Sequence, residues 1–404
     1  MAGGEVFEPG DPGFLADPYP TFHRLRQQGP VHWHPGLGLW VALSHSACDE
    51  VLRDRGLGRI WQDRQPADQF PAFNLLHRTS ILESEPPTHT RLRRLVAAAF
   101  GRGHVERLRP RIQATAYRLV DDLARRLDGG AAADLIELVA EPLPVEVIAE
   151  LLNLPAADRG LLRPWSNAIV KMYEYAPAPE LRRQAEAAAA AFVGYLRDLV
   201  AERRRRPLAG DLVTDLVLAA DGADRLTEDE VVGTCVLLLM AGHEATVNVV
   251  GNGMLALLTH PAEWRRVLAE PDLVPAAAEE MTRYDSSLQL FERTAARDVE
   301  VAGTLVKAGS KIAALLGAAN RDPAVFADPD RFDAGRQVNP HLGFGAGIHF
   351  CLGAPLARIE VQAVLSALRD RLPDLALAAT PVRRPEFVIR GLTGLQVTRS
   401  DGIH

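Results

Sequence analysis

One cysteine beside a glycine-rich segment constrains this chain more than any other feature. The segment FGAGIHFCLG at 344–353 places Cys351 between the glycines and the start of an apolar-periodic stretch typical of a helix. Metals bind the thiolate form of cysteine, and a helix N-terminus stabilises a negative sulfur. The glycines let the backbone lie against a flat ligand without Cβ clashes. The segment therefore predicts a metal-binding thiolate at Cys351, whereas Cys48 and Cys235 are expected to be inert buried residues.

The pattern Phe-Gly-x-Gly-x-His-x-Cys-x-Gly within 344–353 resembles the haem-binding signature of the cytochromes P450. The resemblance implies a haem b whose iron is ligated by the Cys351 thiolate, with Phe344, Gly345 and Gly353 beside the cofactor. The order of elements along the chain is similar as well. We therefore expect the cytochrome P450 fold, mainly α with small peripheral β-sheets, in a single domain over residues 1–404.

Apolar periodicity agrees with that fold class. Helices are predicted at 89–100, 105–127, 144–152, 181–203, 227–258, 261–270, 274–284 and 352–372. Short strands are predicted at 31–34, 39–41, 294–301, 311–315 and 387–397.

The composition bounds the class of protein. Hydrophobic residues make up 47% and charged residues 24% of the 404 positions, which is ordinary for a soluble protein with a large core. The three cysteines form no disulfide framework, so a reducing cytoplasm fits. The net charge of -7 argues against a nucleic-acid partner, and the polar N-terminus predicts neither a signal peptide nor a membrane anchor.

An acid and a base three residues apart share one face of the helix predicted at 274–284. Most such pairs are solvated and contribute little to stability. Glu280 and Arg283 nevertheless match the Glu-x-x-Arg of the P450 family, which the resemblance implies forms a buried structural network with an arginine of the later meander. Arg331, in DPDRF at 328–332, is the expected third member.

Buried haem propionates need cations or hydrogen-bond donors. His89 and Arg93 are four residues apart, so a helix would point both the same way. They resemble the residues that contact propionates in bacterial P450s. Arg293 and His349 match the other donors of the family.

A long helix predicted at 227–258 carries the segment AGHEAT at 241–246. Its start, TEDE at 227–230, is typical of a capping box. The segment resembles the oxygen-activation segment of P450s, in which small residues such as Ala241 and Gly242 leave room for dioxygen. An acid within an apolar helix is costly unless it is paired or wet, so Glu244 is expected to be functional, with a salt bridge or a surface position as the alternative.

The chain departs from the family at the residue after Glu244. The family usually has a threonine there, whose hydroxyl helps to deliver protons. This chain has Ala245, and Thr246 follows about 100° further round the helix. Ordered water, a hydroxyl of the substrate or a shifted Thr246 must therefore complete the path from Glu244.

The resemblance implies a monooxygenase that hydroxylates or epoxidises a medium-to-large apolar molecule, such as a polyketide, terpenoid or steroid-like compound. The chain contains no flavin or iron–sulfur motif, so electrons are expected from an NAD(P)H-dependent ferredoxin reductase and a ferredoxin. Arg94, Arg102 and Arg358 fall near the Cys351 face by resemblance and are expected to attract an acidic ferredoxin. The expected pocket residues, mostly apolar, are Tyr173, Val236, Leu237, Met240, Leu288, Gln289, Leu290, Phe291 and Leu392.

Three other functions stay open. Ala245 is compatible with a peroxide-driven P450 peroxygenase. A haem-binding protein that sequesters a ligand without turnover is a second alternative. A thiol hydrolase that uses Cys351 and His349 is a third, although two residues so close in sequence form a nucleophile–base pair only with loop strain.

Overall fold

The computed structural model describes residues 6–174 and 177–400, except for the side chains of Arg102 and Asp221. Its contacts divide the chain into two compact units. Unit 1 consists of Met1–Gly58, Gln113–Pro142 and Ala245–His404, and unit 2 of Arg59–Ile112 and Leu143–Glu244. Helices α6 (Arg102–Leu127) and α11 (Glu228–Thr259) are divided between the two units, and α7 (Pro142–Leu151) has its first residue in unit 1. The expected single domain therefore stays a prediction.

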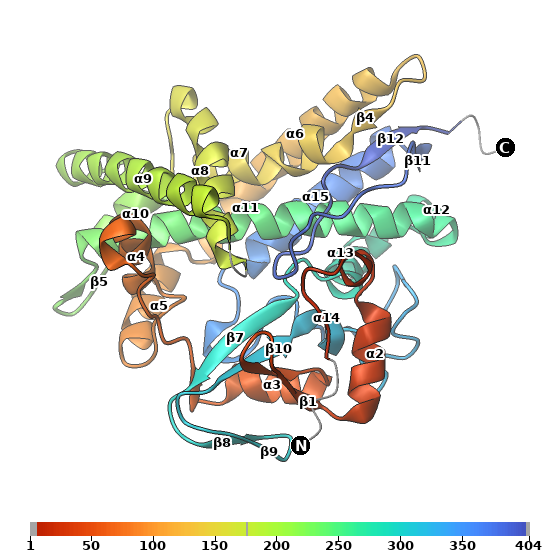
Figure 1. Cartoon of the computed structure of the whole chain (residues 1–404). Helices are drawn as coiled ribbons and strands as arrows, with labels where there is room; N and C mark the ends of the chain where they lie inside the picture. The colour runs from red at the N-terminus through yellow and green to blue at the C-terminus, as the bar shows by residue number, and fades with distance from the viewer. Residues whose placement is uncertain (1–5, 175–176, 401–404) are drawn as a thin grey trace. The chain divides into compact units, whose positions relative to one another are not determined.

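The main sheet belongs to unit 1, and its strands lie in the order β1-β2-β10-β7-β3 (Figure 1). These strands are β1 (Val31–His34), β2 (Leu39–Ala42), β3 (Leu57–Gly58), β7 (Leu290–Ala295) and β10 (Lys311–Leu315). The central strand β10 is parallel to β2 and antiparallel to β7. It is buried from its second residue onward, as its near-continuous apolar sequence requires.

A hairpin of β8 (Val299–Val301) and β9 (Thr304–Val306) follows β7. Its two loop residues, Ala302 and Gly303, both have positive φ, which is the backbone of the two-residue turns that match strand twist. A bend at 296–298, between β7 and β8, interrupts what the sequence predicts as one strand at 294–301. That prediction is therefore half correct, because β7 ends at Ala295.

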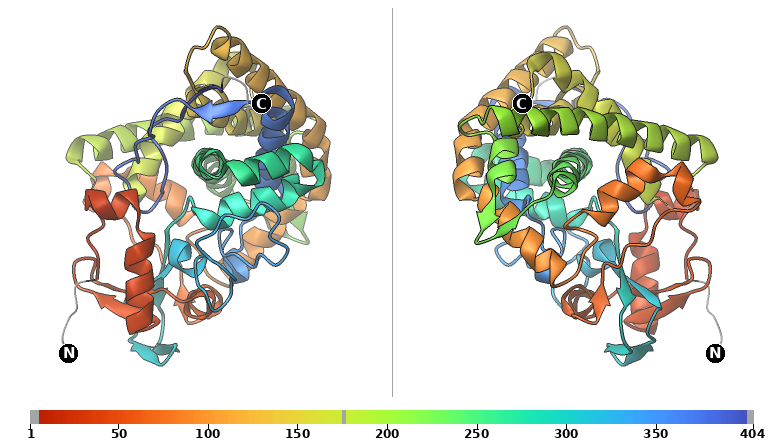
Figure 2. Two further views of the ribbon diagram at one scale, coloured as in Figure 1. Left: turned by 90° about the vertical axis from the view of Figure 1, so that its right-hand side faces the viewer. Right: turned by 90° about the vertical axis from the view of Figure 1, so that its left-hand side faces the viewer.

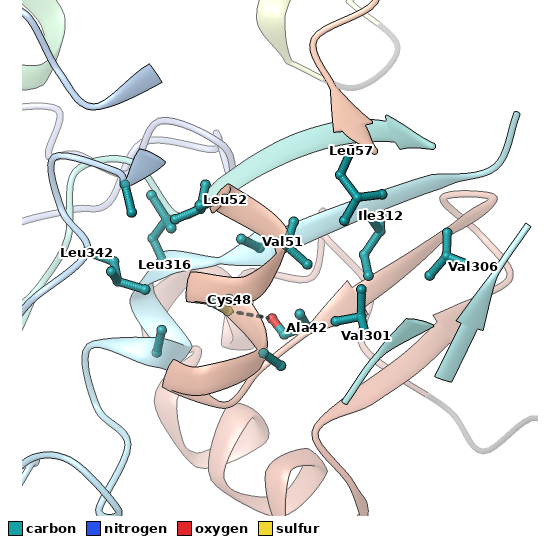
Figure 3. Close-up of a cluster of buried hydrophobic side chains, with 14 of the residues drawn as sticks. Ala42, Cys48, Val51, Leu52, Leu57, Val301, Val306, Ile312, Leu316 and Leu342 are labelled. Carbon is teal, nitrogen blue, oxygen red and sulfur yellow. Dashed lines mark hydrogen bonds between the residues drawn. The ribbon is translucent and has the colours of Figure 1, made fainter. Parts of the chain in front are cut away.

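A hydrophobic cluster joins helix α3 (His45–Arg53) to this sheet (Figure 3). Val51 and Leu52 of α3 pack with Ile312 of β10, and the Cys48 thiol donates to the carbonyl of Ala42 over 3.1 Å. Cys48 is thus a core residue.

The remaining described elements of unit 1 are mostly helical. They are α1 (Pro12–Ala16), α2 (Tyr19–Gln28), π-helix η2 (Ile136–Ala140), α12 (Pro261–Ala269), η5 (Pro271–Leu273), α13 (Val274–Tyr284), α14 (Leu316–Ala319), η6 (Gly347–His349) and α15 (Ala354–Arg371). A small sheet has the order β11-β12-β4, formed by β4 (Ala133–Asp134), β11 (Leu375–Leu377) and β12 (Gln396–Arg399).

Unit 2 contains the long helix α9 (Pro179–Arg205), the yellow-green rod in both views of Figure 2. Helix α9 contacts α8 (Leu162–Val170) and α4 (Pro71–Arg78), and its Glu186 accepts the backbone N–H groups of Ala72 and Phe73 at the start of α4. The other described elements are η1 (Ala67–Gln69), α5 (Thr88–Ala99), α7 (Pro142–Leu151), η3 (Ala156–Leu161), η4 (Lys171–Tyr173), α10 (Leu212–Leu218), β5 (Ala220–Asp221) and β6 (Asp224–Arg225).

Helix α11 begins as its sequence predicts. The N–H of Thr227 donates to Glu230 Oε2 over 2.8 Å, and the N–H of Glu230 donates to Thr227 Oγ1 over 3.2 Å, which confirms the capping box. The helix is long and apolar enough to cross a bilayer by composition, but 78% of its apolar window is buried inside the protein. A core helix of a soluble protein has the same properties.

Candidate active site

Cys351 lies between η6 and α15, in a segment over residues 343–353 that we call the Cys351 loop. Gly345 and Gly347 both have φ of +69°, a backbone conformation that favours glycine. The backbone N–H of Cys351 donates to the carbonyl of Phe344 over 2.9 Å, which closes the loop on itself. Helix α15 begins at Ala354 with Gly353 as its N-cap, so Cys351 precedes the helix by three residues instead of standing at its first turn.

Two of the glycines are also required by close packing. A Cβ at Gly347 would lie 2.6 Å from the carbonyl oxygen of Leu52, and one at Gly343 would lie 2.6 Å from Thr282 Cγ2. The backbone of the loop therefore packs closely against α3 at Gly347 and against α13 at Gly343.

The three cysteines divide as the sequence predicts. Cys48 and Cys235 are fully buried, and desolvation raises the pKa of each thiol, to about 12 for Cys235. Cys351 is half-buried in the loop. Of these sulfurs, only the one in the loop is accessible to a ligand.

Glu280 and Arg283 form the buried pair that their spacing and the family motif predict. Both side chains have no exposed area, and the guanidinium donates to both carboxylate oxygens over 2.7 Å. Arg283 also donates to the carbonyls of Asn320 and Pro329. The pair is thus a structural network on α13.

The prediction for Arg331 is wrong, because Arg336 takes its place. The Nε of Arg336 donates to the two oxygens of Glu280 over 3.2 and 3.1 Å. The Arg331 side chain is 59% exposed and lies 3.8 Å from Glu263, and only its backbone carbonyl accepts from Arg283. The tight turn at Asp328, whose φ is +45°, directs the Arg331 side chain outward.

The four predicted propionate donors lie in different units. His89 is buried and Arg93 half-buried on α5 of unit 2, one helical turn apart. Arg293 is fully buried on β7 of unit 1, with its guanidinium 4.4 Å from the centre of the Phe291 ring. His349 ends η6 in the Cys351 loop. Their joint role at a propionate stays a prediction.

An accessible stripe of small residues marks the middle of α11. Ala241 and Ala245 are exposed, although His243, Glu244 and Thr246 between and beside them are buried. The two alanines are four residues apart and so share one face. Gly242 serves packing instead, because a Cβ there would lie 3.2 Å from Ile148 Cδ1.

Sequence reasoning missed Glu360. This residue of α15 is 2% exposed, and its Oε1 has no hydrogen-bond partner within the described part of the chain. Burial raises the pKa of its carboxyl to about 8, while a hydrogen bond with Thr246 opposes the rise. The signal was present in the sequence, because Glu360 lies four residues after Leu356 and three before Ala363 on the apolar face of the helix.

The predicted pocket residues fall into two groups. Gln289 has no exposed area, and its amide donates to the carbonyl of Ser286. Its side chain packs against Gly317. The other buried members are Leu290, Leu392, Val236 and Met240. The partly exposed members are Leu237, Leu288, Phe291 and Tyr173. The pocket stays a prediction for both groups.

These residues fit a thiolate-bound haem. The loop offers one accessible soft ligand and two positive-φ glycines with no side chain to obstruct a flat macrocycle. In the middle of α11, the exposed residues Ala241 and Ala245 offer only their methyl groups. Cys351 would bind the iron, and the buried cation of Arg293 suits a propionate.

Fold and site together define a haem-thiolate protein, and sequence comparison gives the family. Residues 161–370 match the family model described as cytochrome P450. The chain belongs to the cytochrome P450 family of monooxygenases, whose cofactor is a haem ligated by cysteine thiolate.

Individual relatives cover most of the chain. It is 41% identical over 392 residues to the cytochrome P450 monooxygenase PikC of Streptomyces venezuelae, covering 95% of this chain and 91% of that protein. It is 42% identical over 317 residues to the mycinamicin IV hydroxylase/epoxidase of Micromonospora griseorubida, covering 78% and 76%. The crystal structure of P450BioI in complex with hexadec-9Z-enoic acid ligated acyl carrier protein matches with a TM-score of 0.91 at 32% identity, covering 96% of this chain and 99% of that one.

Proposed function

We propose that this protein inserts one atom of dioxygen into a C–H or C=C bond of a medium-to-large apolar small molecule, such as a polyketide, terpenoid or steroid-like compound. The Cys351 loop carries the proposal, because it holds a partly exposed cysteine whose backbone N–H is bonded to the carbonyl of Phe344, where a thiolate ligand is needed. Two relatives support the substrate class, one named as a mycinamicin IV hydroxylase/epoxidase and one solved in complex with an acyl carrier protein that is ligated to hexadec-9Z-enoic acid.

A haem bound through Cys351 supplies the oxidising chemistry, because electron donation from the thiolate favours O–O cleavage. We assign proton delivery to residues of α11. Glu244 is a buried acid, whereas Ala245 has no hydroxyl. Thr246 is buried and hydrogen-bonded with Glu360, so its hydroxyl is not on the stripe formed by Ala241 and Ala245. We therefore assign the relay from Glu244 to ordered water or to a hydroxyl of the substrate.

Electrons would come from a ferredoxin and an NAD(P)H-dependent reductase in the cytoplasm. Arg94 supports docking of an acidic partner, because its side chain is 55% exposed even though it pairs with Asp224 over 3.4 Å. The side chain of Arg102 lies outside the described part of the structure.

The test begins with a compound library, in which a true substrate shifts the spin state of the haem absorption band. Each hit is then incubated with the haem-loaded protein, a surrogate ferredoxin and reductase, NADH and isotopically labelled dioxygen. Incorporation of one labelled oxygen atom per product supports the proposal. Turnover with hydrogen peroxide alone would support the peroxygenase, and spin shifts without product from either oxidant would support a ligand-sequestering protein.

A further inference from the structure

Two neighbouring carboxylates on α13 serve different partners. Glu280 belongs to the buried network with Arg283, whereas Glu279, rotated by about 100° round the helix, faces α15 and the Cys351 loop. Glu279 is outside the Glu-x-x-Arg motif, and nothing in the site described so far gives it a role.

Glu279 receives hydrogen bonds from two side chains. The guanidinium of Arg358 donates through Nε to Oε1 over 2.7 Å and through Nη2 to Oε2 over 2.9 Å, which is a bidentate pair. The ring of His341 lies with Nε2 3.1 Å from Glu279 Oε2. Burial alone would raise the pKa of Glu279, but the hydrogen bonds from His341 and Arg358, together with the charge of Arg358, lower it to about 2.

Both partners of Glu279 extend to the loop. The Nδ1 of His341 accepts the backbone N–H of Gly343 over 3.1 Å, so the ring carries its proton on Nε2 and donates to Glu279. The guanidinium of Arg358 lies 4.6 Å from the centre of the Phe344 ring. The carbonyl of Phe344 in turn accepts the N–H of Cys351. One carboxylate is thus connected to Gly343, Phe344 and the ligand cysteine.

The side chains of Glu279 and Arg358 affect the Cys351 sulfur through their charges as well as through the geometry of the loop. The pKa of Arg358 is raised first by its hydrogen bond to Glu279 and also by the negative charge of Cys351, which means that the guanidinium and the thiolate attract each other. Because Glu279 neutralises most of that cation, the field at the sulfur depends on the balance between the two side chains.

We propose that Glu279, His341 and Arg358 form a clamp that positions Phe344 and sets the charge balance at the Cys351 thiolate, and thereby tunes the reduction potential of the bound haem. The clamp rests on the proposed haem–thiolate function. In this role Arg358 is a positioning residue, and its guanidinium is already committed to Glu279 and Phe344.

The charge balance predicts opposite effects for the two ends of the ion pair. Arg358→Gln removes a positive charge beside the thiolate, so the ferric state is favoured and the potential falls. Glu279→Gln leaves Arg358 uncompensated, so the ferrous state is favoured and the potential rises. Arg358→Lys keeps the charge and should stay near the wild-type potential, although it loses the bidentate geometry.

Helix α15 contains a matched control. Arg371 pairs with Asp121 over 2.8 Å and lies 5.1 Å from the ring of Tyr117, so it repeats the arginine–carboxylate–aromatic arrangement far from the loop. Arg371→Gln should leave the potential unchanged.

The experiment is spectroelectrochemical titration of the haem-loaded protein for the wild type and these four variants. At a fixed solution potential near the wild-type midpoint, we expect the ratio of ferrous to ferric protein to change several-fold in opposite directions for Arg358→Gln and Glu279→Gln. Shifts in the same direction, or shifts equal to that of Arg371→Gln, would overturn the clamp. If a variant binds no haem, His341→Gln provides the second test, and an unchanged thiolate band after its reduction in carbon monoxide would also overturn the clamp. Absence of a thiolate band in the wild type would instead refute the proposed function.

Discussion

The Cys351 loop and the 241–246 segment of α11 are constructed in opposite ways. The loop needs glycine at Gly345 and Gly347, and its shape is supported by neighbouring backbone and buried ion pairs. The α11 segment is regular helix, whose hydrogen bonds any residue but proline can make. Substitutions in the loop should therefore act on stability and haem binding, whereas substitutions at the exposed Ala241 and Ala245 of α11 should act mainly on chemistry. This difference explains why the family pattern is intact in the loop and altered at Ala245.

The largest effect is expected in the network on α13 that supports the loop. Glu280→Gln leaves the buried guanidinium of Arg283 without its carboxylate, which should lower the free energy of unfolding by about 3–5 kcal/mol. Arg336→Gln should be clearly destabilising as well, whereas Arg331→Gln should change stability by less than about 0.5 kcal/mol because that side chain is exposed. Urea denaturation measures the free energy of unfolding of all three variants. Equal costs for Arg331→Gln and Arg336→Gln would restore Arg331 to the network.

A pH-dependent effect is expected at Glu360, where α15 meets α11. Its folded pKa of about 8 lies above the ordinary value of 4.5, so between these values the folded protein keeps a proton that the unfolded chain has lost. Stability therefore falls as pH rises through this window, by at most about 1.4 kcal/mol per pH unit, and becomes flat above it.

Glu360→Gln should remove this slope, so the stability of the variant relative to the wild type should increase as pH rises. Denaturant unfolding at several pH values gives the slope, with Glu300→Gln as a control because Glu300 is exposed on β8. Parallel pH profiles for the wild type and Glu360→Gln would show that Glu360 is ionised in the folded state.

A smaller cost is expected from a methyl group in the loop. Gly347→Ala adds a Cβ 2.6 Å from the Leu52 carbonyl at φ of +69°, which should cost about 2–3 kcal/mol and reduce haem incorporation. Gly309→Ala is the matched control, because Gly309 has φ of +80° but no atom within 4 Å of an added Cβ. It should cost about 1 kcal/mol and leave the haem content unchanged. Equal effects at both positions would mean that close packing does not fix the loop.

The smallest effect on stability is expected in the α11 segment. Glu244→Ala should reduce product formation, and a tenfold loss would correspond to about 1.4 kcal/mol of barrier. Ala245→Thr should keep haem binding and alter the division of NADH between product and peroxide. Both variants are assayed for product and peroxide per NADH on one bound substrate. Unchanged coupling in both would show that neither position handles protons.

Features with short sequence spacing could be predicted from the sequence. The capping box at Thr227, the Glu280–Arg283 pair and the Cys351 loop all depend on residues within one turn or one loop. Most of the long helices were also predicted to within a few residues.

Features that depend on residues far apart in the sequence could not be predicted from the sequence. Arg336 and Arg331 are indistinguishable until the turn at Asp328 fixes their directions. The strand predicted at 387–397 is mostly irregular, because Arg390 is held by Asp285 over 2.7 Å and the ladder begins only at β12. The link from Glu360 to Thr246 needs two helices to pack together.

Thiolate ligation by Cys351 is the assignment from which the other functional roles follow. The most direct measurement is the absorption spectrum of the reduced carbon monoxide complex of the wild type, Cys351→Ser and Cys235→Ser. The wild type and Cys235→Ser should show the red-shifted band of thiolate-bound haem, and Cys351→Ser should lack it, because a serine hydroxyl stays protonated and is a poor soft ligand. Persistence of that band in Cys351→Ser would contradict the assignment.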